Sequence, residues 1–181
     1  MIYIALGLFA AGIIALDQIT KFFTTQHYRD QFIYAVEHIA DAEFVPLEAS
    51  PIRFWDGILQ FRFVANDGMG FSMLEGFRWF FVVMTIAALV LIVFAYRKKW
   101  VNHPTGYWAL ASVAGGAIGN LIDRIRFGFV VDMIEVKFID FPVFNVADCF
   151  IVCGAILLLI YAFFFDKKEE KLHDTDCGQS Q

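Results

Sequence analysis

Two carboxylates, Asp132 and Asp148, occupy apolar surroundings that carboxylates normally avoid. Asp132 lies in FGFVVDMIEV, and Asp148 lies in the first turn of an apolar run, residues 144–165. Two partly desolvated carboxyl groups close together share one proton, because one pKa rises and the other falls. The ionised group can then activate water for attack on an amide carbonyl, while the protonated group polarises that carbonyl and protonates the leaving amine. Carboxylates at membrane depth also serve ion pathways and proton relays, so spacing alone does not decide between these functions.

Polar side chains that could support these carboxylates occur at helical spacing. Asp17 and Lys21 in LDQITK lie four residues apart with the acid first, which is the favourable order for an ion pair on one helical face. We interpret them as a structural polar pair that neutralises its own burial. Asn145 lies three residues before Asp148, so it can cap the following helix or share a face with the carboxylate. Both roles remain open.

A small-residue face precedes a further polar group. Gly115 and Gly119 in ALASVAGGAIGNLIDRIR have GxxxG spacing, which allows close packing of helices. Directly after them, Asn120 can share a helical face with Asp123 or with Arg124. A structural network and a role in supporting the active carboxylates fit these residues equally well.

The composition indicates what kind of protein must position these groups. The 181 residues are 59% hydrophobic and 18% aromatic, and their mean hydropathy is +0.61, which is too apolar for a soluble domain. The length fits one unit. The formal net charge of -5 provides no basic surface, so we expect no nucleic-acid partner. The sequence therefore predicts an all-α membrane protein.

Crossing a bilayer core of about 30 Å takes about 20 mostly apolar helical residues, and four segments approach this length, so we expect four spans. Basic residues gather at 97–99, between the second and third segments, and at 167–171, after the fourth. Because cytoplasmic loops are enriched in Lys and Arg, we expect both termini in the cytoplasm. Residues 24–77 and a short outer loop between the third and fourth helices then lie outside. The predicted spans are about 2–23, 78–96, 105–123 and 144–165.

The outer segment 24–77 contains one predicted strand. In ILQFRFVANDGMGFSML the apolar Leu59, Phe61 and Phe63 alternate with Gln60 and Arg62, which predicts a strand, and Asp67-Gly68 fits a hairpin turn. We predict a small extracytoplasmic β-sheet that lies on the membrane. Residues 30–56 are polar and irregular, and we assign them no role. The chain is predicted to be a single integral membrane domain, 1–166, followed by a polar, disordered cytoplasmic tail, 167–181.

The sequence gives little support for a metalloprotease or for a serine peptidase. The three cysteines fit neither a disulfide framework nor a zinc pattern, and the four histidines are scattered, so we expect no metal ion and no cofactor. Ser72 and Ser112 have no histidine near them in sequence. Two alternatives to a peptidase remain. One is a small proton-coupled transporter or channel that uses the two carboxylates as relay groups, and the other is a non-catalytic scaffold.

Four motifs, in this order, resemble those of the lipoprotein signal peptidases, also called signal peptidase II. The motifs are LDQITK, NDGMGFS, GGAIGNLIDRIRFGFVVDMI and FNVADCFIVCG, and the resemblance runs from residue 16 to 157. It implies a metal-free aspartyl endopeptidase of the bacterial inner membrane. Such enzymes cleave the signal peptide of a prolipoprotein on the amino side of a cysteine that carries a diacylglyceryl group. The active site would lie near the outer face of the membrane.

The resemblance also implies roles for single residues. Asp132 of VVDM and Asp148 of NVAD match the catalytic pair, and Asp17 and Lys21 match a polar pair that supports the structure. Other matching positions surround the catalytic pair or help to position the substrate. These positions are Asn66, Gly68, Asn120, Arg124 and Asn145.

The chain departs from the family pattern at a few places. Met133 follows the first aspartate where an aromatic residue is frequent, and Cys149 follows the second where a small residue is common. Residues 28–56 form a longer stretch than in many relatives, so no functional residue is assigned there. The expected partners are prolipoprotein signal peptides that carry diacylglyceryl-cysteine, together with membrane lipid. One catalytic pair per chain is consistent with a monomer.

Overall fold

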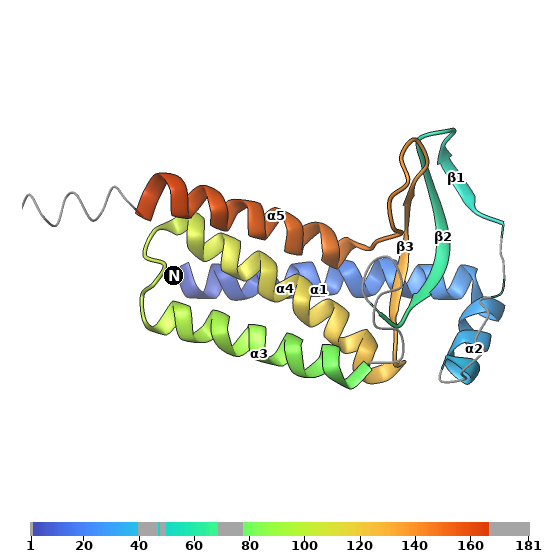
Figure 1. Cartoon of the computed structure of the whole chain (residues 1–181), viewed down its shortest axis with the longest axis horizontal. Helices are drawn as coiled ribbons and strands as arrows, with labels where there is room; N and C mark the ends of the chain where they lie inside the picture. Colours follow the sequence, from blue (N-terminus) through green and yellow to red (C-terminus); the bar gives the residue numbers. More distant parts are fainter. Residues whose placement is uncertain (1, 40–46, 48–49, 69–77, 167–181) are drawn as a thin grey trace, which may run out of the picture.

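The computed structural model describes residues 2–39, 47, 50–68 and 78–166. Long helices lie side by side, and a small sheet crosses one end of them (Figure 1). The predicted tail, 167–181, and the second half of the NDGMGFS motif, from Met69, lie outside the described residues. The elements in chain order are α1 (Ile2–His27), α2 (Arg29–His38), β1 (Ile52–Trp55), β2 (Leu59–Asn66), α3 (Arg78–Arg97), α4 (Pro104–Arg126), β3 (Val130–Val136), α5 (Val146–Tyr161) and a π-helical turn (Ala162–Asp166).

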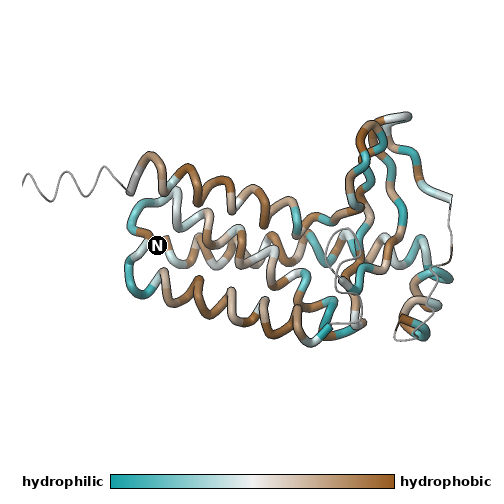
Figure 2. The backbone as a smooth tube through the Cα atoms, viewed as in Figure 1, coloured by the Kyte–Doolittle hydropathy of each residue, from teal (hydrophilic) through white to brown (hydrophobic). Residues whose placement is uncertain are grey.

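Three helical segments of the described chain are long and apolar enough to cross a membrane. They are Ile2–His27, Arg78–Arg97 and Val146–Phe164. The helix α4 is less apolar because it carries glycines and the polar group near Asn120, and it packs against α1, α3 and α5. Apolar residues run along the helices, whereas hydrophilic residues gather at the loops and near the sheet (Figure 2). The prediction of a mostly helical membrane protein with a small sheet is therefore confirmed.

Glycines in α4 allow this helix to approach α1 and α5 closely. A Cβ atom added at Gly115 would lie 3.0 Å from the Cβ of Ile13, and one at Gly119 would lie 2.6 Å from Oδ2 of Asp17. At Gly116 it would collide with the carbonyl oxygen of Ala147. The small-residue face predicted from the sequence is thus the surface through which α4 contacts α1 and α5.

The three strands form an antiparallel sheet in the order β1-β2-β3. The hairpin turn predicted at Asp67-Gly68 would lead into residues 69–77, which lie outside the described residues, so it stays a prediction. A hairpin turn among the described residues follows β1 at Asp56 and Gly57, and Gly57 has a φ of +73°, which favours glycine. The segment expected to be only a short outer loop between helices contains β3. This strand has no alternating pattern because Val130 to Met133 are buried on both faces.

The segment 30–56, expected to be irregular, contributes α2 and β1. Ala35 of α2 is buried against Phe129, Val131 and Met133, so α2 covers one face of the sheet. The hydroxyl group of Tyr28, at the junction of α1 and α2, donates to the carbonyl oxygen of Phe61 at 2.9 Å. The junction of α1 and α2, together with α2, therefore joins the sheet to the end of the helices.

Candidate active site

Asp132 is placed by the register of β2 and β3. In this register Val64 pairs with Asp132 and Asn66 pairs with Val130, so Asn66 is the diagonal neighbour of Asp132 on one face of the sheet. The register shifts between Phe61 and Val64. Without that shift the diagonal position would fall on residue 65, an alanine. The irregularity thus brings an amide to the carboxylate, and Nδ2 of Asn66 donates to Oδ2 of Asp132 at 2.8 Å.

Asp148 is placed by the first turn of α5. Asn145 is the N-cap of this helix, and its Oδ1 accepts the backbone N–H of Asp148 at 3.0 Å. In return, Oδ2 of Asp148 accepts the backbone N–H of Asn145 at 3.2 Å, which completes a capping box. Oδ1 of Asp148 accepts a hydrogen bond from Nδ2 of Asn120 at 2.7 Å. Asp148 is half-buried, and thus more exposed than Asp132.

Asn145 connects the two aspartates. Its Nδ2 donates to Oδ1 of Asp132 at 2.6 Å and to Oδ1 of Asn120 at 3.1 Å, while its backbone binds Asp148. The residue is fully buried. Both polar groups of its side chain are therefore engaged within the protein, which favours the role of helix cap over a contact with substrate.

The two carboxyl groups differ in their surroundings. Asp132 is 1% exposed, and burial raises its pKa to about 7, with a further upward contribution from the charge of Asp148. Hydrogen bonds from Asn66 and Asn145 and the charge of Lys21 act in the opposite direction. At neutral and acidic pH, Asp132 is thus suited to hold a proton beside the more exposed Asp148.

A second polar group lies directly behind the two aspartates. Nζ of Lys21 lies 2.9 Å from Oδ2 of Asp17 and 2.8 Å from Oδ2 of Asp123. The side chain of Gln18 donates to both carboxylates, at 3.2 Å and 3.0 Å. We call Asp17, Gln18, Lys21 and Asp123 the buried cluster. Asp17, Lys21 and Asp123 are each no more than 3% exposed.

Sequence reasoning noted Asp123 but did not place it in the site, and it assigned no role to Gln18. The spacing of Asp17 and Lys21 indicated an ion pair within α1, but the second carboxylate comes from α4, about 100 residues later. No local pattern connects Lys21 with Asp123. The only available signal was the position of Asp123 one turn after Asn120, on the same helical face.

Arg124 and Gly68 meet at the end of β2. Nη2 of Arg124 donates to the carbonyl oxygen of Gly68 at 3.3 Å, and its guanidinium lies 5.0 Å from the ring centroid of Phe81. Gly68 in turn donates its backbone N–H to Oδ1 of Asn66 at 3.2 Å. The Nε atom of Arg124 is buried and has no hydrogen-bond partner among the described residues. All of the residues selected from the motifs thus lie in one region, where α1, α4, α5 and the sheet meet.

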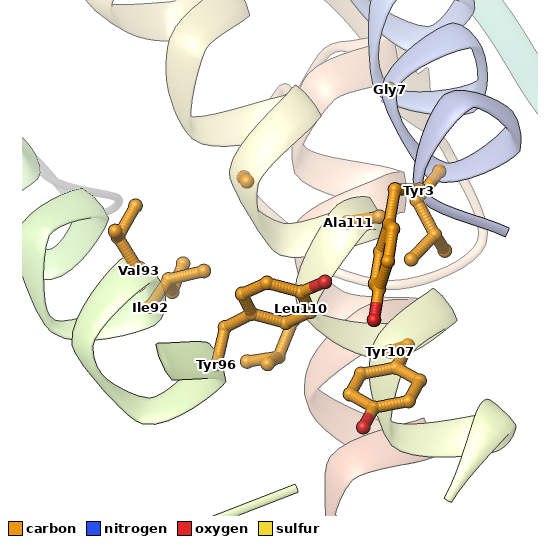
Figure 3. Close-up of a pocket in the computed structure, with 10 residues that line it drawn as sticks. Tyr3, Gly7, Ile92, Val93, Tyr96, Tyr107, Leu110 and Ala111 are labelled. Atoms are coloured by element: carbon orange, nitrogen blue, oxygen red, sulfur yellow. The ribbon is translucent and has the colours of Figure 1, made fainter. Parts of the chain in front are cut away.

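The described part of the chain contains no group of three or more His, Cys, Asp or Glu side chains suited to holding a metal ion. A cavity of about 380 Å³ lies between α1, α3 and α4 (Figure 3). Tyr3, Tyr96 and Tyr107 line it near the N-terminus of α1, at the end of the helices away from the sheet. None of its described lining residues is acidic, so it is separate from the carboxylate site.

Comparisons with known proteins identify the family. The model of signal peptidase II matches residues 9–164. The chain belongs to the signal peptidase II family. Among its relatives, lipoprotein signal peptidases of Streptococcus pyogenes serotypes M1 and M5 (strain Manfredo) are 38% and 37% identical over 152 residues, covering 82% of this chain and 86% of each relative.

Solved structures agree with the family assignment. Two structures described as bacterial membrane enzymes have TM-scores of 0.69 with this chain and are 26% and 27% identical to it. One comparison covers 98% of this chain and 93% of the solved chain, and the other covers 89% and 94%. The chain is therefore a bacterial membrane protein of the signal peptidase II family, and nothing in the comparisons supports a transporter or channel.

Proposed function

We propose that this protein is a membrane aspartyl endopeptidase that cleaves the signal peptide from diacylglyceryl-modified prolipoproteins, on the amino side of the lipidated cysteine. The observation that carries the proposal is the connection of Asp132 and Asp148 through Asn145, in a chain of the signal peptidase II family. We call these two aspartates the dyad. The named relatives are lipoprotein signal peptidases, which supports the same substrate class.

In the proposed reaction Asp148 is the base and Asp132 is the acid. Asp148 takes a proton from water as the water oxygen bonds to the scissile carbonyl carbon, while Asp132 gives its proton to the carbonyl oxygen. When the C–N bond breaks, the leaving nitrogen takes its proton from Asp148, which gained it from water, rather than from the group protonated at the start. Asp132 recovers its proton from the collapsing hydroxyl group. The half-buried position of Asp148 and the raised pKa of Asp132 support this division of roles.

The surrounding amides are proposed to hold the two carboxyl groups in place. Asn66 and Asn145 bind separate oxygens of Asp132, and Asn120 binds Asp148. Such preorganisation of the reacting groups lowers the entropic part of the barrier. Arg124 lies close enough to influence both aspartates electrostatically, and with Gly68 it is proposed to border the bound substrate.

We propose that α4 is a fourth span, so that both termini are cytoplasmic and the dyad lies near the outer face. Basic residues at 97–99 support a cytoplasmic link between α3 and α4. The sheet crosses the opposite end of the helices (Figure 1). Large apolar side chains are exposed in β1 and in the segment after β3, which suits a sheet resting on the outer leaflet. They include Phe54, Trp55, Phe138 and Phe141.

This location fits the proposed substrate. A signal peptide is an apolar helix whose cleavage site lies near the outer interface, and a diacylglyceryl group anchors its cysteine in the outer leaflet. A dyad at that depth can be reached from the lipid side. We propose that residues 1–166 form one catalytic domain and that a monomer is sufficient, because both aspartates come from one chain.

The substrate class is tested with purified protein and two forms of one prolipoprotein, with and without the diacylglyceryl group. We expect cleavage of the lipidated form only, and intact mass should place the cut directly before the modified cysteine. Cleavage of both forms at equal rates would contradict the substrate assignment. A carboxylate-dependent proton flux into vesicles with no peptide product would instead support a transporter.

A further inference from the structure

We infer that Lys21 is a positioning residue that fixes the distance and orientation between Asp132 and Asp148. This inference rests on the proposed peptidase function. It assigns Lys21 no contact with substrate. The buried cluster around Lys21 acts on the dyad through the backbone of the two segments that carry the aspartates.

Each dyad aspartate is anchored by the residue directly before it. The backbone N–H of Val131, which precedes Asp132, donates to Oδ2 of Asp123 at 3.2 Å. The backbone N–H of Ala147, which precedes Asp148, donates to Oδ1 of Asp17 at 3.0 Å. The two carboxylates of the buried cluster therefore hold the two catalytic segments, one carboxylate for each segment.

Lys21 joins the two anchors. Its ammonium binds Asp17 from its own helix and Asp123 from α4, and it also donates to Oδ1 of Asn120 at 2.9 Å. An ammonium group has three N–H donors, so all three have an acceptor. The side chain of Lys21 is only 4% exposed, so these bonds are shielded from bulk solvent.

Asn120, the third acceptor of Lys21, connects the ammonium group to the dyad through side-chain hydrogen bonds. Asn120 uses Oδ1 for Lys21 and Nδ2 for Oδ1 of Asp148, so binding to the ammonium fixes which face of the amide meets the carboxylate. The same Oδ1 accepts from Asn145, which binds Asp132. Lys21 is thus connected to both aspartates by side chains as well as by backbone.

The geometry of the cluster favours positioning over simple stabilisation. Buried ion clusters often contribute no more stability than apolar side chains of similar volume would. Directional bonds to a charged group do, however, fix positions closely, and small displacements of catalytic groups reduce rates by about 100-fold. Gly119 helps to position the buried cluster, because only glycine leaves room for Asp17 at this point.

A charge-conserving double variant tests the inference. Lys21→Met with Asp17→Asn removes one positive and one negative charge, keeps an oxygen acceptor for the N–H of Ala147, and removes the ammonium bridge. We expect kcat to fall by about 100-fold while KM stays within about threefold, because substrate contacts are unchanged. Lys137→Met and Asp56→Asn are matched controls at exposed positions away from the cluster, and they should retain wild-type kcat.

A pair of variants at Asp123 provides a second test if the double variant does not fold. Asp123→Asn keeps an acceptor for the N–H of Val131, whereas Asp123→Leu removes it. We expect a loss of about tenfold in kcat for Asp123→Asn and about 100-fold for Asp123→Leu. Wild-type kcat in the folded double variant or in Asp123→Asn would overturn the inference.

The assay separates this inference from the proposed function. Asp132→Asn and Asp148→Asn are measured beside the cluster variants. If these dyad variants cleave like wild type, the proposed function fails. If they are inactive and the cluster variants retain wild-type kcat, the dyad stands and the role of Lys21 is refuted.

Discussion

Nδ2 of Asn145 lies 2.6 Å from Oδ1 of Asp132, although Asn145 is also the N-cap of the helix that carries Asp148. One side chain therefore caps the start of α5 and also hydrogen-bonds to Asp132 in the strand β3. The amide is required for both tasks, since its oxygen caps the helix while its nitrogen reaches the carboxylate.

Substitution at Asn145 separates these two tasks. Asn145→Ser keeps a good helix cap but has no donor that reaches Asp132, whereas Asn145→Ala loses both functions. We expect the serine variant to keep its unfolding temperature but to lose about tenfold or more in kcat. The alanine variant should lose this activity and also about 1 kcal/mol of stability. Equal activity of the serine variant and wild type would argue against the role of the amide nitrogen.

The raised pKa of Asp132 predicts a dependence of stability on pH. Between the ordinary pKa of 3.8 and about 7, the folded protein keeps this proton while the unfolded chain has lost it. The contribution of Asp132 is therefore fully present below pH 3.8, declines as pH rises to about 7, and changes little above that. Asp132→Asn removes this dependence. Thermal unfolding in detergent should show the variant gaining stability relative to wild type between pH 4 and pH 8, and a constant difference would contradict the assignment.

Activity should depend on the same proton. The profile of kcat/KM against pH reports ionisation in the free enzyme, so we expect a bell shape whose basic limb falls near pH 7, as Asp132 ionises. The charge of Asp148 raises the pKa of Asp132 and that of Lys21 lowers it, so variants at either position should move this limb. A profile that stays flat up to pH 9 would exclude a shared-proton dyad.

Close packing at Gly119 should be sensitive to a single methyl group. In Gly119→Ala the new Cβ would lie 2.6 Å from Oδ2 of Asp17, which is fixed by Lys21 and cannot move freely. We expect a loss of about 1 to 3 kcal/mol in stability and a reduced kcat. Gly12→Ala is the matched control in α1, because a Cβ there has no neighbour within 4 Å. Equal stability and equal kcat of Gly119→Ala and Gly12→Ala would show that the close approach of Gly119 to Asp17 does not limit either property.

The helices could be predicted from the sequence because their apolar runs match the thickness of a membrane. The predicted span 78–96 agrees with Arg78–Arg97 of α3, whereas α1 continues to His27 because its polar end extends beyond the apolar run. The strand that carries Asp132 could not be recognised by alternation, since both of its faces are buried at that point. The helix α2 lies in a polar segment. One of its faces is buried only because it packs on the sheet, and the local sequence gives no sign of that contact.

The candidate site residues could be selected from the sequence where motifs contain them. The contacts that join distant segments could not be predicted in this way. The motifs pointed to Asp132, Asp148 and the amides around them. The link from Lys21 to Asp123, and from these residues to the backbone before each aspartate, depends on the packing of α4 against α1. Such contacts follow from tertiary structure, so spacing along the chain gives no sign of them.

The most direct test of the whole account is the cleavage of a diacylated prolipoprotein by purified Asp132→Asn and Asp148→Asn variants, followed as a shift in product mass on a gel. Each variant should fold, bind substrate and lose cleavage by at least about 10³-fold, since neither carboxyl group can replace the other. Asp56→Asn, at an exposed position, should cleave like wild type. Cleavage at the wild-type rate by either dyad variant would contradict the central claim that Asp132 and Asp148 together perform the hydrolysis.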